Sequence, residues 1–316
     1  MANTVVVGVT FVDIKGFPFA KYNAKGRNLG DVKIVHGGVS RNVVENFANV
    51  GMPVSFASML DESAVGRDVA RKLSAAGADL TFMETVGDHG LGMWLVVLDE
   101  SGNLAGSISK MPDVSILEEH IARNGDAIVS QAENIVLEID LNDRIAATVL
   151  NLAEKYHKKV YAIVGNMSVI MAHSEFLHKT DCFICNEIEA GKLFASDAIP
   201  AFSPDQMLEY LPVAAKSAGI PSMVVTMGSH GSVYYDGASG EAGICPPYPA
   251  HVVDTSGAGD AFFSGTVMGL TRKLPLSAAV RYGAKLASLT IGSEENSCPV
   301  NHSFFAEPPV LSAVTI

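Results

Sequence analysis

The sequence predicts an α/β protein: a doubly wound, mostly parallel sheet with helices on both faces, plus a small β-sheet lid. Three observations support this prediction. Short apolar runs alternate with amphipathic stretches of helical period along most of the 316 residues. Charged residues make up only 18% of the chain, below the ~25% of an average soluble protein, which suits a sheet that is buried on both faces. Two insertions without a helical period interrupt the alternation.

The first part of the alternation begins with a strand. Residues 4–10 (TVVVGVT) are uncharged and mostly β-branched, which favours a buried strand. A helix is predicted over residues 40–50, where apolar residues recur at helical spacing and Gly51 stands at the C-cap position. A strand at 54–58 and a helix at 63–76, closed by Gly77, complete this part.

The alternation continues through the second half of the chain. Strands are predicted at 127–129, 134–138, 160–164, 182–185 and 222–226, helices at 142–158, 187–194 and 204–218, and a further apolar helix through 263–270. Connections of this length imply parallel strands joined by right-handed crossovers. Residues 299–316 form a proline-containing tail for which no element is predicted.

The two insertions are residues 12–35 and 91–108. The first contains Gly16, Gly26 and Gly30, which we interpret as turn residues, and the second reads as two strands joined by a turn. The insertions either add local strands at the sheet edge or pair into a separate lid. We favour the lid, because both follow predicted core strands, where ligands of α/β folds bind. The predicted core comprises residues 1–11, 36–90 and 112–316, and the predicted lid comprises residues 12–35 and 91–111.

Composition excludes several classes of protein. With 48% hydrophobic residues the chain can build a packed core, which excludes general disorder. A net charge of −12 without any basic stripe argues against a nucleic-acid partner. No apolar window approaches the ~18 residues of a membrane span, and the N-terminus lacks the basic region of a signal peptide. Four cysteines are too few for a disulfide framework in a chain of this length, so we expect a cytoplasmic protein without a membrane partner.

The strongest functional signal is segment 254–263, Asp-Thr-Ser-Gly-Ala-Gly-Asp-Ala-Phe-Phe. The turn Gly257-Ala258-Gly259 opens a helix, so it directs unpaired backbone N–H groups and the positive end of the helix dipole at one point, where an anion is expected. Asp260 in the first helical turn would repel that anion unless its carboxylate takes a proton from a hydroxyl that attacks a phosphoryl group. The alternative is a glycine turn with an Asp that only favours the dipole. We favour the first interpretation because ten consecutive residues agree with it.

A second signal is segment 36–42, His-Gly-Gly-Val-Ser-Arg-Asn. Gly37 and Gly38 permit close approach of a ligand to the backbone, or a hinge between lid and core. Asn42, one turn into the following helix, can reach the same cleft and hydrogen-bond a sugar hydroxyl. An ordinary turn with a solvent-facing Asn42 fits the segment equally well.

A third signal is Asn186-Glu187-Ile188-Glu189, directly after an apolar strand. Asn186 and Glu189 share a face, and such a pair suits a network of Mg²⁺, water and phosphate, because Mg²⁺ keeps several waters and takes few carboxylates. The competing interpretation, an N-cap Asn with an acidic first turn, rests on the same residues and is favoured when this segment is taken alone.

Together these segments resemble the ribokinase-like (PfkB-type) family of carbohydrate and nucleoside kinases. Residues 254–263 resemble its C-terminal signature, residues 37–42 its N-terminal signature, residues 186–189 its Asn-x-x-Glu motif, and residues 226–231 (Thr-Met-Gly-Ser-His-Gly) its nucleotide-site loop. The order and spacing fit over nearly the whole chain. The resemblance implies the ribokinase-like fold and an enzyme that uses ATP and Mg²⁺ to phosphorylate a primary hydroxyl.

The resemblance also implies residue roles. Asp260 would be the base, and the amides of Gly257, Ala258 and Gly259 the anion hole. Asn186, Thr226, Gly228 and Gly231 would line the nucleotide, while Glu189 with Asn186 would organise Mg²⁺ through water. Asp13, Gly37, Gly38 and Asn42 match the family's substrate contacts; Glu138 ends a predicted strand and faces either the substrate or solvent. Family members often bind a monovalent cation such as K⁺ near the residue corresponding to Asp254. Lids in this family can exchange strands, so the insertions would also allow a homodimer through the lid.

The acceptor is less well specified by the sequence. The form Gly-Gly-Val-x-Arg-Asn at residues 37–42 and the run at residues 234–243 are most similar to pseudouridine kinases, so the favoured acceptor is the 5′-hydroxyl of pseudouridine. Residues 165–168 read Gly-Asn-Met-Ser where such kinases tend to carry Asp-Pro, which leaves ribokinase, adenosine kinase or another sugar specificity open. A non-catalytic sugar- or nucleotide-binding regulator ranks lower, because Asp260 and the Gly-Ala-Gly turn are both present.

Overall fold

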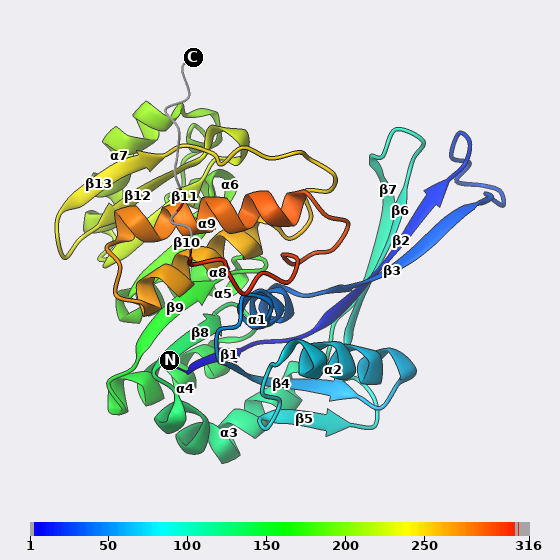
Figure 1. Ribbon diagram of the computed structural model, residues 1–316, viewed down its shortest axis with the longest axis horizontal. Helices are drawn as coiled ribbons and strands as arrows, with labels where there is room; N and C mark the ends of the chain where they lie inside the picture. The colour runs from blue at the N-terminus through cyan, green and yellow to red at the C-terminus, as the bar shows by residue number, and fades with distance from the viewer. Residues whose placement is uncertain (1–2, 307–308, 310–316) are drawn as a thin grey trace.

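The computed structural model describes residues 3–306 and residue 309, so most of the predicted tail after residue 306 lies outside the described residues. Within the described residues the strands form two separate sheets (Figure 1). The larger sheet has nine strands: β1 (Thr4–Val7), β4 (Val54–Asp61), β5 (Met83–Val86), β8 (Asn134–Glu138), β9 (Lys159–Ile163), β10 (Cys182–Asn186), β11 (Ser222–Thr226), β12 (Ser232–Asp236) and β13 (Glu241–Cys245). The smaller sheet has four: β2 (Phe11–Pro18), β3 (Gly30–Gly37), β6 (Gly92–Leu98) and β7 (Leu104–Lys110).

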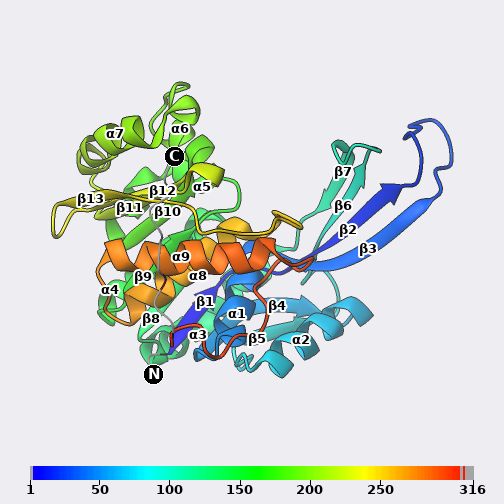
Figure 2. The same ribbon diagram turned by 45° about the horizontal axis from the view of Figure 1, so that its top comes forward.

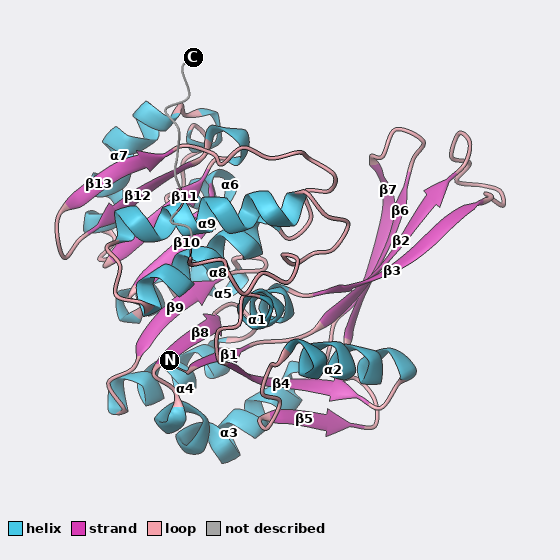
Figure 3. Cartoon of the chain, viewed as in Figure 1, coloured by secondary structure: helices cyan, strands magenta, loops and turns pink. Residues whose placement is uncertain are grey.

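Helices cover both faces of the larger sheet (Figures 1 and 3). One face carries α1 (Val39–Asn49), α2 (Ala64–Ala76), α8 (Ala258–Thr271) and α9 (Leu276–Ile291). The other face carries α3 (Val114–Gln131), α4 (Asp143–Lys155), α5 (Ser168–Ala172), α6 (Glu187–Leu193) and α7 (Pro204–Ser217). The three-layer arrangement follows from strands that are apolar on both sides.

The strand order of the larger sheet is β13-β12-β11-β10-β9-β8-β1-β4-β5. All neighbouring strands from β11 to β5 pair in parallel, and β12 and β13 are added antiparallel at one edge. The chain leaves β1 towards β4 and β5 and later returns on the other side of β1 through β8. This reversal of direction is the topological switch point at which α/β sheets bind ligands, beyond the carboxyl ends of the strands. The predicted doubly wound, mostly parallel sheet is confirmed.

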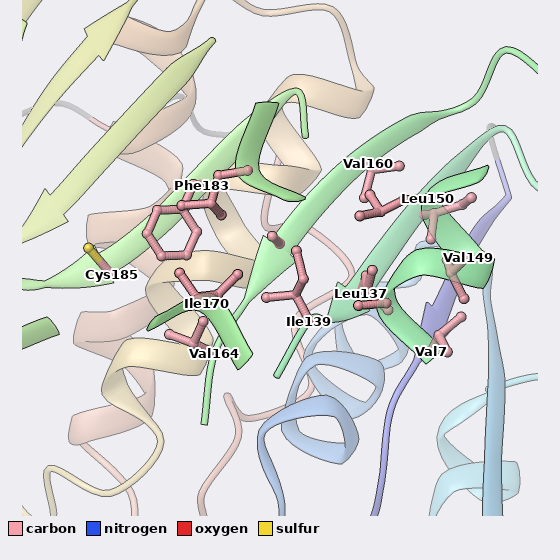
Figure 4. Packing of buried hydrophobic residues seen from close by; sticks show 14 of the residues in the cluster. Val7, Leu137, Ile139, Val149, Leu150, Val160, Val164, Ile170, Phe183 and Cys185 are labelled. Atoms are coloured by element: carbon pink, nitrogen blue, oxygen red, sulfur yellow. The ribbon is translucent and has the colours of Figure 1, made fainter. Parts of the chain in front are cut away.

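The core is divided by the sheet into two apolar clusters. Val5 and Val7 on β1 pack into one cluster, and Val6 between them packs into the other. Figure 4 shows part of the first cluster, in which Leu137 and Val160 from neighbouring strands meet the α4 side chains. Alternate residues of a strand point to opposite faces, so a strand that is apolar at every position can be buried only between two helical layers.

The smaller sheet extends away from the core, as Figure 2 shows, and has the strand order β3-β2-β6-β7. We refer to β2, β3, β6 and β7 as the lid. Gly26 lies in the turn between β2 and β3. Gly16 lies within β2, paired with Val32, and Gly30 is the first residue of β3, paired with Pro18, so the assignment of these two glycines to turns was wrong. The error arose because an isolated glycine marks both turns and strand interiors where backbones approach closely.

One predicted element of the core is wrong. Residues 127–129 belong to α3 and not to a strand, because Leu117, Ile121 and Ile128 lie at helical spacing on its buried face. Asp113 caps this helix by accepting a hydrogen bond from Ser115 N, so the apolar run at its end continues a helix that begins much earlier. The other predicted strands and helices exist with ends shifted by a few residues, while α3, α5, α9, β5, β12 and β13 were not predicted as elements.

None of the helices in the described part of the chain combines the length and the apolarity needed to span a bilayer.

Candidate active site

The loop before α8 lies at the carboxyl edge of the sheet and has the geometry expected for an anion site. Gly257 has a φ of +75°, and a Cβ atom there would lie 2.1 Å from the carbonyl oxygen of Asn296, so only glycine fits. A Cβ atom on Gly259 would meet nothing within 4 Å, so open space lies in front of the first turn of α8. Backbone N–H groups without helical partners surround this space, together with the positive end of the helix dipole.

Asp260 and Asn42 meet beside this space. Asn42 Nδ2 donates a hydrogen bond of 2.6 Å to Asp260 Oδ2, although 218 residues separate them. Burial raises the pKa of Asp260 to about 6, against the hydrogen bond from Asn42 and the charge of Arg41, which both lower it. A carboxylate with a pKa near neutrality is suited to general base catalysis. The solvent-facing alternative for Asn42 is wrong, because its side chain is buried in the site.

Gly37 and Gly38 hold the start of α1 against the lid. A Cβ atom on Gly38, which has a φ of +94°, would lie 2.8 Å from Phe11 N, and one on Gly37 would lie 2.7 Å from Asp13 Oδ1. The two glycines therefore allow β2 and the start of α1 to approach closely. Buried Arg41 stabilises this turn through contacts with Gly37 O, His36 O, Asn42 Oδ1 and Glu45.

Asp13 on β2 faces the same space from the lid side. Its Oδ2 accepts a hydrogen bond of 3.2 Å from Asn296 Nδ2, which also donates to His36 O. Burial raises the pKa of Asp13, while the charge of Lys15 and the hydrogen bond from Asn296 lower it. Asn296 was not predicted from the sequence. It lies in the loop after α9 and carries no motif that could have identified it.

Glu138 is buried at the end of β8 and does not face solvent, so the solvent alternative is wrong. It accepts hydrogen bonds from Ser40 Oγ (2.7 Å) and Val9 N (3.1 Å), which tie the β1–β2 connection to the start of α1. Burial raises the pKa of Glu138 to about 7, against these two hydrogen bonds, and the charges of Asp140 and Asp260 raise it further. Glu138 therefore stabilises the walls of the site.

A cavity of about 470 Å³ adjoins the anion loop on the side away from the lid. Thr226, Gly228 and Gly231 line it at the end of β11, and Ala258 and Gly259 line it at the start of α8. Most of its lining is apolar and includes side chains of α9, which suits a flat, largely apolar group such as a nucleobase. The three residues predicted for the nucleotide site after β11 therefore lie together beside the predicted anion site.

Asn186 and Glu189 cap α6. Asn186 Oδ1 accepts from Ile188 N and Glu189 N (both 2.9 Å), and Glu189 Oε2 accepts from Asn186 N (2.8 Å), so the pair forms a complete capping box. Asn186 does not line the cavity, but it is the register partner of Thr226, which does. Burial raises the pKa of Glu189, against the hydrogen bond from Asn186 N. Among the described residues no group of three or more His, Cys, Asp or Glu side chains could hold a metal ion, so a metal here would depend on water and phosphate for most of its ligands.

Asp254 begins the anion loop and has a cation beside it. Its Oδ1 accepts from Ser256 N (2.8 Å), and its Oδ2 lies 3.6 Å from Lys15 Nζ on β2 of the lid. Partial burial acts to raise the pKa of Asp254, but the Ser256 hydrogen bonds and Lys15 hold it below its ordinary value. The sequence assigned no role to Lys15.

Comparisons with known proteins agree with this geometry. The family model described as pfkB family carbohydrate kinase matches residues 1–301. A guanosine-inosine kinase of Exiguobacterium acetylicum is 35% identical over 94% of this chain and 96% of that protein. A pseudouridine kinase of Escherichia coli K12 is 24% identical over 93% of this chain and 92% of that protein. A structure of Arabidopsis thaliana ribokinase complexed with ribose and ATP superposes with a TM-score of 0.80 at 22% identity, covering 98% of this chain and 99% of that one. The predicted ribokinase-like fold is confirmed.

Proposed function

The chain belongs to the pfkB family of carbohydrate kinases, and from that premise we propose that it transfers the γ-phosphate of ATP to the 5′-hydroxyl of a purine nucleoside, guanosine or inosine. The observation that carries this choice of acceptor is the 35% identity to a guanosine-inosine kinase along almost the full length of both proteins. Pseudouridine, which the sequence motifs favoured, becomes the second candidate, supported by those motifs and by 24% identity to a pseudouridine kinase.

The lid supports a nucleoside over a free sugar. Asp13 on β2 is the register partner of Trp94 on the parallel strand β6, so both side chains lie on the same face of the lid. The side chain of Trp94 is half-buried, so part of its ring is accessible to a ligand. An aromatic ring beside the carboxylate that would bind the ribose hydroxyls offers a stacking surface for the attached base.

The proposed reaction uses the residues in these positions. The acceptor hydroxyl lies between Asp260 and the γ-phosphate, with Asn42 and Asp13 holding the sugar. Asp260 takes the hydroxyl proton as the hydroxyl oxygen forms its bond to the γ-phosphorus, and the bond from that phosphorus to the β-phosphate oxygen breaks to release ADP. The amides of Gly257, Ala258 and Gly259 stabilise the charge on the transferred phosphoryl group.

The residues near the capping box are compatible with Mg²⁺. One oxygen of Glu189 accepts from Asn186 N, which leaves the other to bind a water of the metal. When bound, Mg²⁺ would supply positive charge to the phosphate oxygens. A K⁺ ion near Asp254 stays part of the proposal, and Lys15 already supplies one positive charge to that carboxylate.

We extend the proposal to a homodimer formed through the lid. Ile14, Ile34, Leu95 and Ile108 are register neighbours across the four strands, on the lid face opposite Asp13. Ile34, Leu95 and Ile108 are 60%, 40% and 70% exposed, so they form an uncovered aliphatic row that a second copy of the same sheet would bury.

The four cysteines are buried free thiols, and the cytoplasm remains the proposed location.

The test is ADP release by the purified protein with ATP and Mg²⁺ and a set of acceptors: guanosine, inosine, adenosine, pseudouridine, uridine, ribose and fructose 6-phosphate. Preferential turnover of guanosine and inosine supports the proposal, and preference for pseudouridine moves the assignment to the second candidate. Preference for ribose or fructose 6-phosphate refutes a nucleoside acceptor. Nucleotide binding without turnover of any acceptor would favour the regulator considered from the sequence.

A second arm tests the role of Trp94. The substitution Trp94→Ala should raise the KM of the preferred nucleoside about 10-fold or more, the value expected for one lost base–aromatic stack, with a smaller effect on kcat. An unchanged KM would contradict stacking on the lid.

A further inference from the structure

Lys15 is a buried cation that the lid carries into the active site. It lies at the middle of β2, and its side chain is only 11% exposed. Its Nζ donates a hydrogen bond of 3.1 Å to Ser256 Oγ and lies 3.6 Å from Asp254 Oδ2. Within the described part of the chain it is the only buried lysine. Burying an ammonium group is costly, so its position beside the anion loop requires an explanation.

The charges of the site point to an anionic ligand for Lys15. Carboxylates gather around the space in front of α8: the charges of Asp13 and Glu189 act on Asp260, and Asp254 lies in the same loop. A triphosphate would bring more negative charge. Arg41, which together with Lys15 makes up the buried lysines and arginines of the described residues, is engaged by Glu45, two backbone carbonyls and Asn42. Lys15 is therefore the buried cation placed to compensate charge on an incoming phosphate.

The position of Lys15 also fits the direction of phosphate entry. The cavity of about 470 Å³ proposed to hold the nucleotide is lined at the anion loop by Thr255, Ala258 and Gly259. Ser256, the partner of Lys15, directly follows Thr255 in this loop. An ammonium group has three N–H donors, and two of them can serve Ser256 and Asp254. One donor is left for a phosphate oxygen at the amides of the loop.

We propose that Lys15 binds the phosphoryl group during its transfer, so that the lid supplies a catalytic cation to an anion hole formed by the core. This inference rests on the proposed function. Lys15 forms and breaks no covalent bond and keeps its proton: the acceptor oxygen bonds to the γ-phosphorus, ADP leaves, and Asp260 takes the hydroxyl proton. Because the cation belongs to the lid, transfer is efficient only while the lid lies against the anion loop, and hydrolysis by water in the open site is suppressed.

The chain offers a matched control in Lys33. It is the direct cross-strand partner of Lys15 on β3, and it also bridges the lid to the core, through Glu294 at 2.9 Å. Lys33, however, is half-exposed, and its partner lies outside the anion loop. If Lys15 only anchored the lid, the substitutions Lys15→Met and Lys33→Met would have similar effects.

The experiment compares these two variants with the wild type, after circular dichroism has shown that both are folded. Lys15→Met should lower kcat for the preferred nucleoside about 100-fold or more, as expected for loss of one charge-stabilising group, with less than a threefold change in nucleoside KM. Lys33→Met should stay within threefold of wild type in kcat. Equal losses in both variants, or an effect of Lys15→Met on KM alone, would overturn the proposal.

A binding measurement separates this proposal from the proposed function. Calorimetric titration with ATP and with ADP needs no acceptor. Lys15→Met should weaken ATP binding at least tenfold and ADP binding less than twofold, because only ATP carries the γ-phosphate. Equal weakening of both nucleotides would refute the role of Lys15 even if a nucleoside is phosphorylated. If the wild type phosphorylates none of the nucleosides, the proposed function is refuted. The role of Lys15 is then decided by how much more Lys15→Met weakens ATP binding than ADP binding.

Discussion

Replacing the proposed base should make the protein less active and more stable at neutral pH. Burial raises the pKa of Asp260 from 3.8 to about 6, so the folded protein holds a proton on this carboxyl over a pH range in which the unfolded chain has lost it. Stability therefore falls as the pH rises from about 4 to 6. At neutral pH the ionised carboxylate of Asp260 lowers the unfolding free energy by about 3 kcal/mol. The uncharged side chain in Asp260→Asn removes this destabilisation.

The assay is thermal unfolding of wild type and Asp260→Asn at pH 4.5 and pH 7.5. At pH 4.5 Asp260 is mostly protonated in the folded wild type. By the same linkage relation, Asp260 then lowers the unfolding free energy by only about 1 kcal/mol. The stability difference between variant and wild type should thus widen by about 2 kcal/mol between the two pH values, which for a chain of 316 residues is a shift of about 3 °C in Tm. The variant should also lose at least about 100-fold in kcat while still binding ATP.

Asp254→Asn is the matched control in the same loop. The pKa of Asp254 is held below its ordinary value, so its ionised form stabilises the fold, and that contribution is present above the pKa of the unfolded chain. The substitution at Asp254 should therefore destabilise the protein at pH 7.5, opposite in sign to the one at Asp260. A stability difference for Asp260→Asn that stays the same at both pH values, or a Tm below that of wild type at pH 7.5, would refute the reasoning.

Three further predictions concern the same structure. With saturating ATP and Mg²⁺, kcat/KM should fall about tenfold per pH unit below pH 6, because protonated Asp260 cannot take the hydroxyl proton; a flat profile down to pH 5 would contradict this role. Gly257→Ala should lower the unfolding free energy by more than about 2 kcal/mol, because the added Cβ would overlap Asn296 O. Gly259→Ala should keep the wild-type Tm, because its Cβ projects into the open space before α8, and it should weaken ATP binding in a calorimetric titration. If the lid forms a homodimer, Ile34→Lys should yield a monomer in analytical ultracentrifugation with a wild-type circular dichroism spectrum; an unchanged association state would exclude this face as the interface.

The features of the candidate site that the sequence indicated are local. The loop before α8 is recognisable because glycine at Gly257 satisfies a positive φ and the following residues begin a helix, and both requirements act within a few positions. Asp260 follows in the first turn. The alternation of strands and helices likewise predicted the doubly wound sheet, since burial on both faces leaves a direct pattern in the chain.

The parts that the sequence did not predict depend on distant contacts. Lys15 meets Ser256 across 241 positions and Asn296 meets Asp13 across 283, and neither residue type is unusual where it stands. A lysine in a strand is ordinarily exposed, so only the packing of the lid against the α8 loop reveals its burial. For Asn186 the difficulty was different, because a capping box and a metal-organising pair use the same residues at the same spacing.

The docking of the segment after α9 has a consequence for synthesis of the protein. Asn296 contacts Asp13, and the backbone of Cys298 is held by Asn46 and Asn49 on α1. The ribosome adds about 5–20 residues per second, so on the order of half a minute passes between emergence of the lid strand β2 and arrival of the residue that orients its carboxylate. A nascent chain can therefore bury part of its core before Asn296 holds the carboxylate of Asp13, so the candidate site is completed late in synthesis.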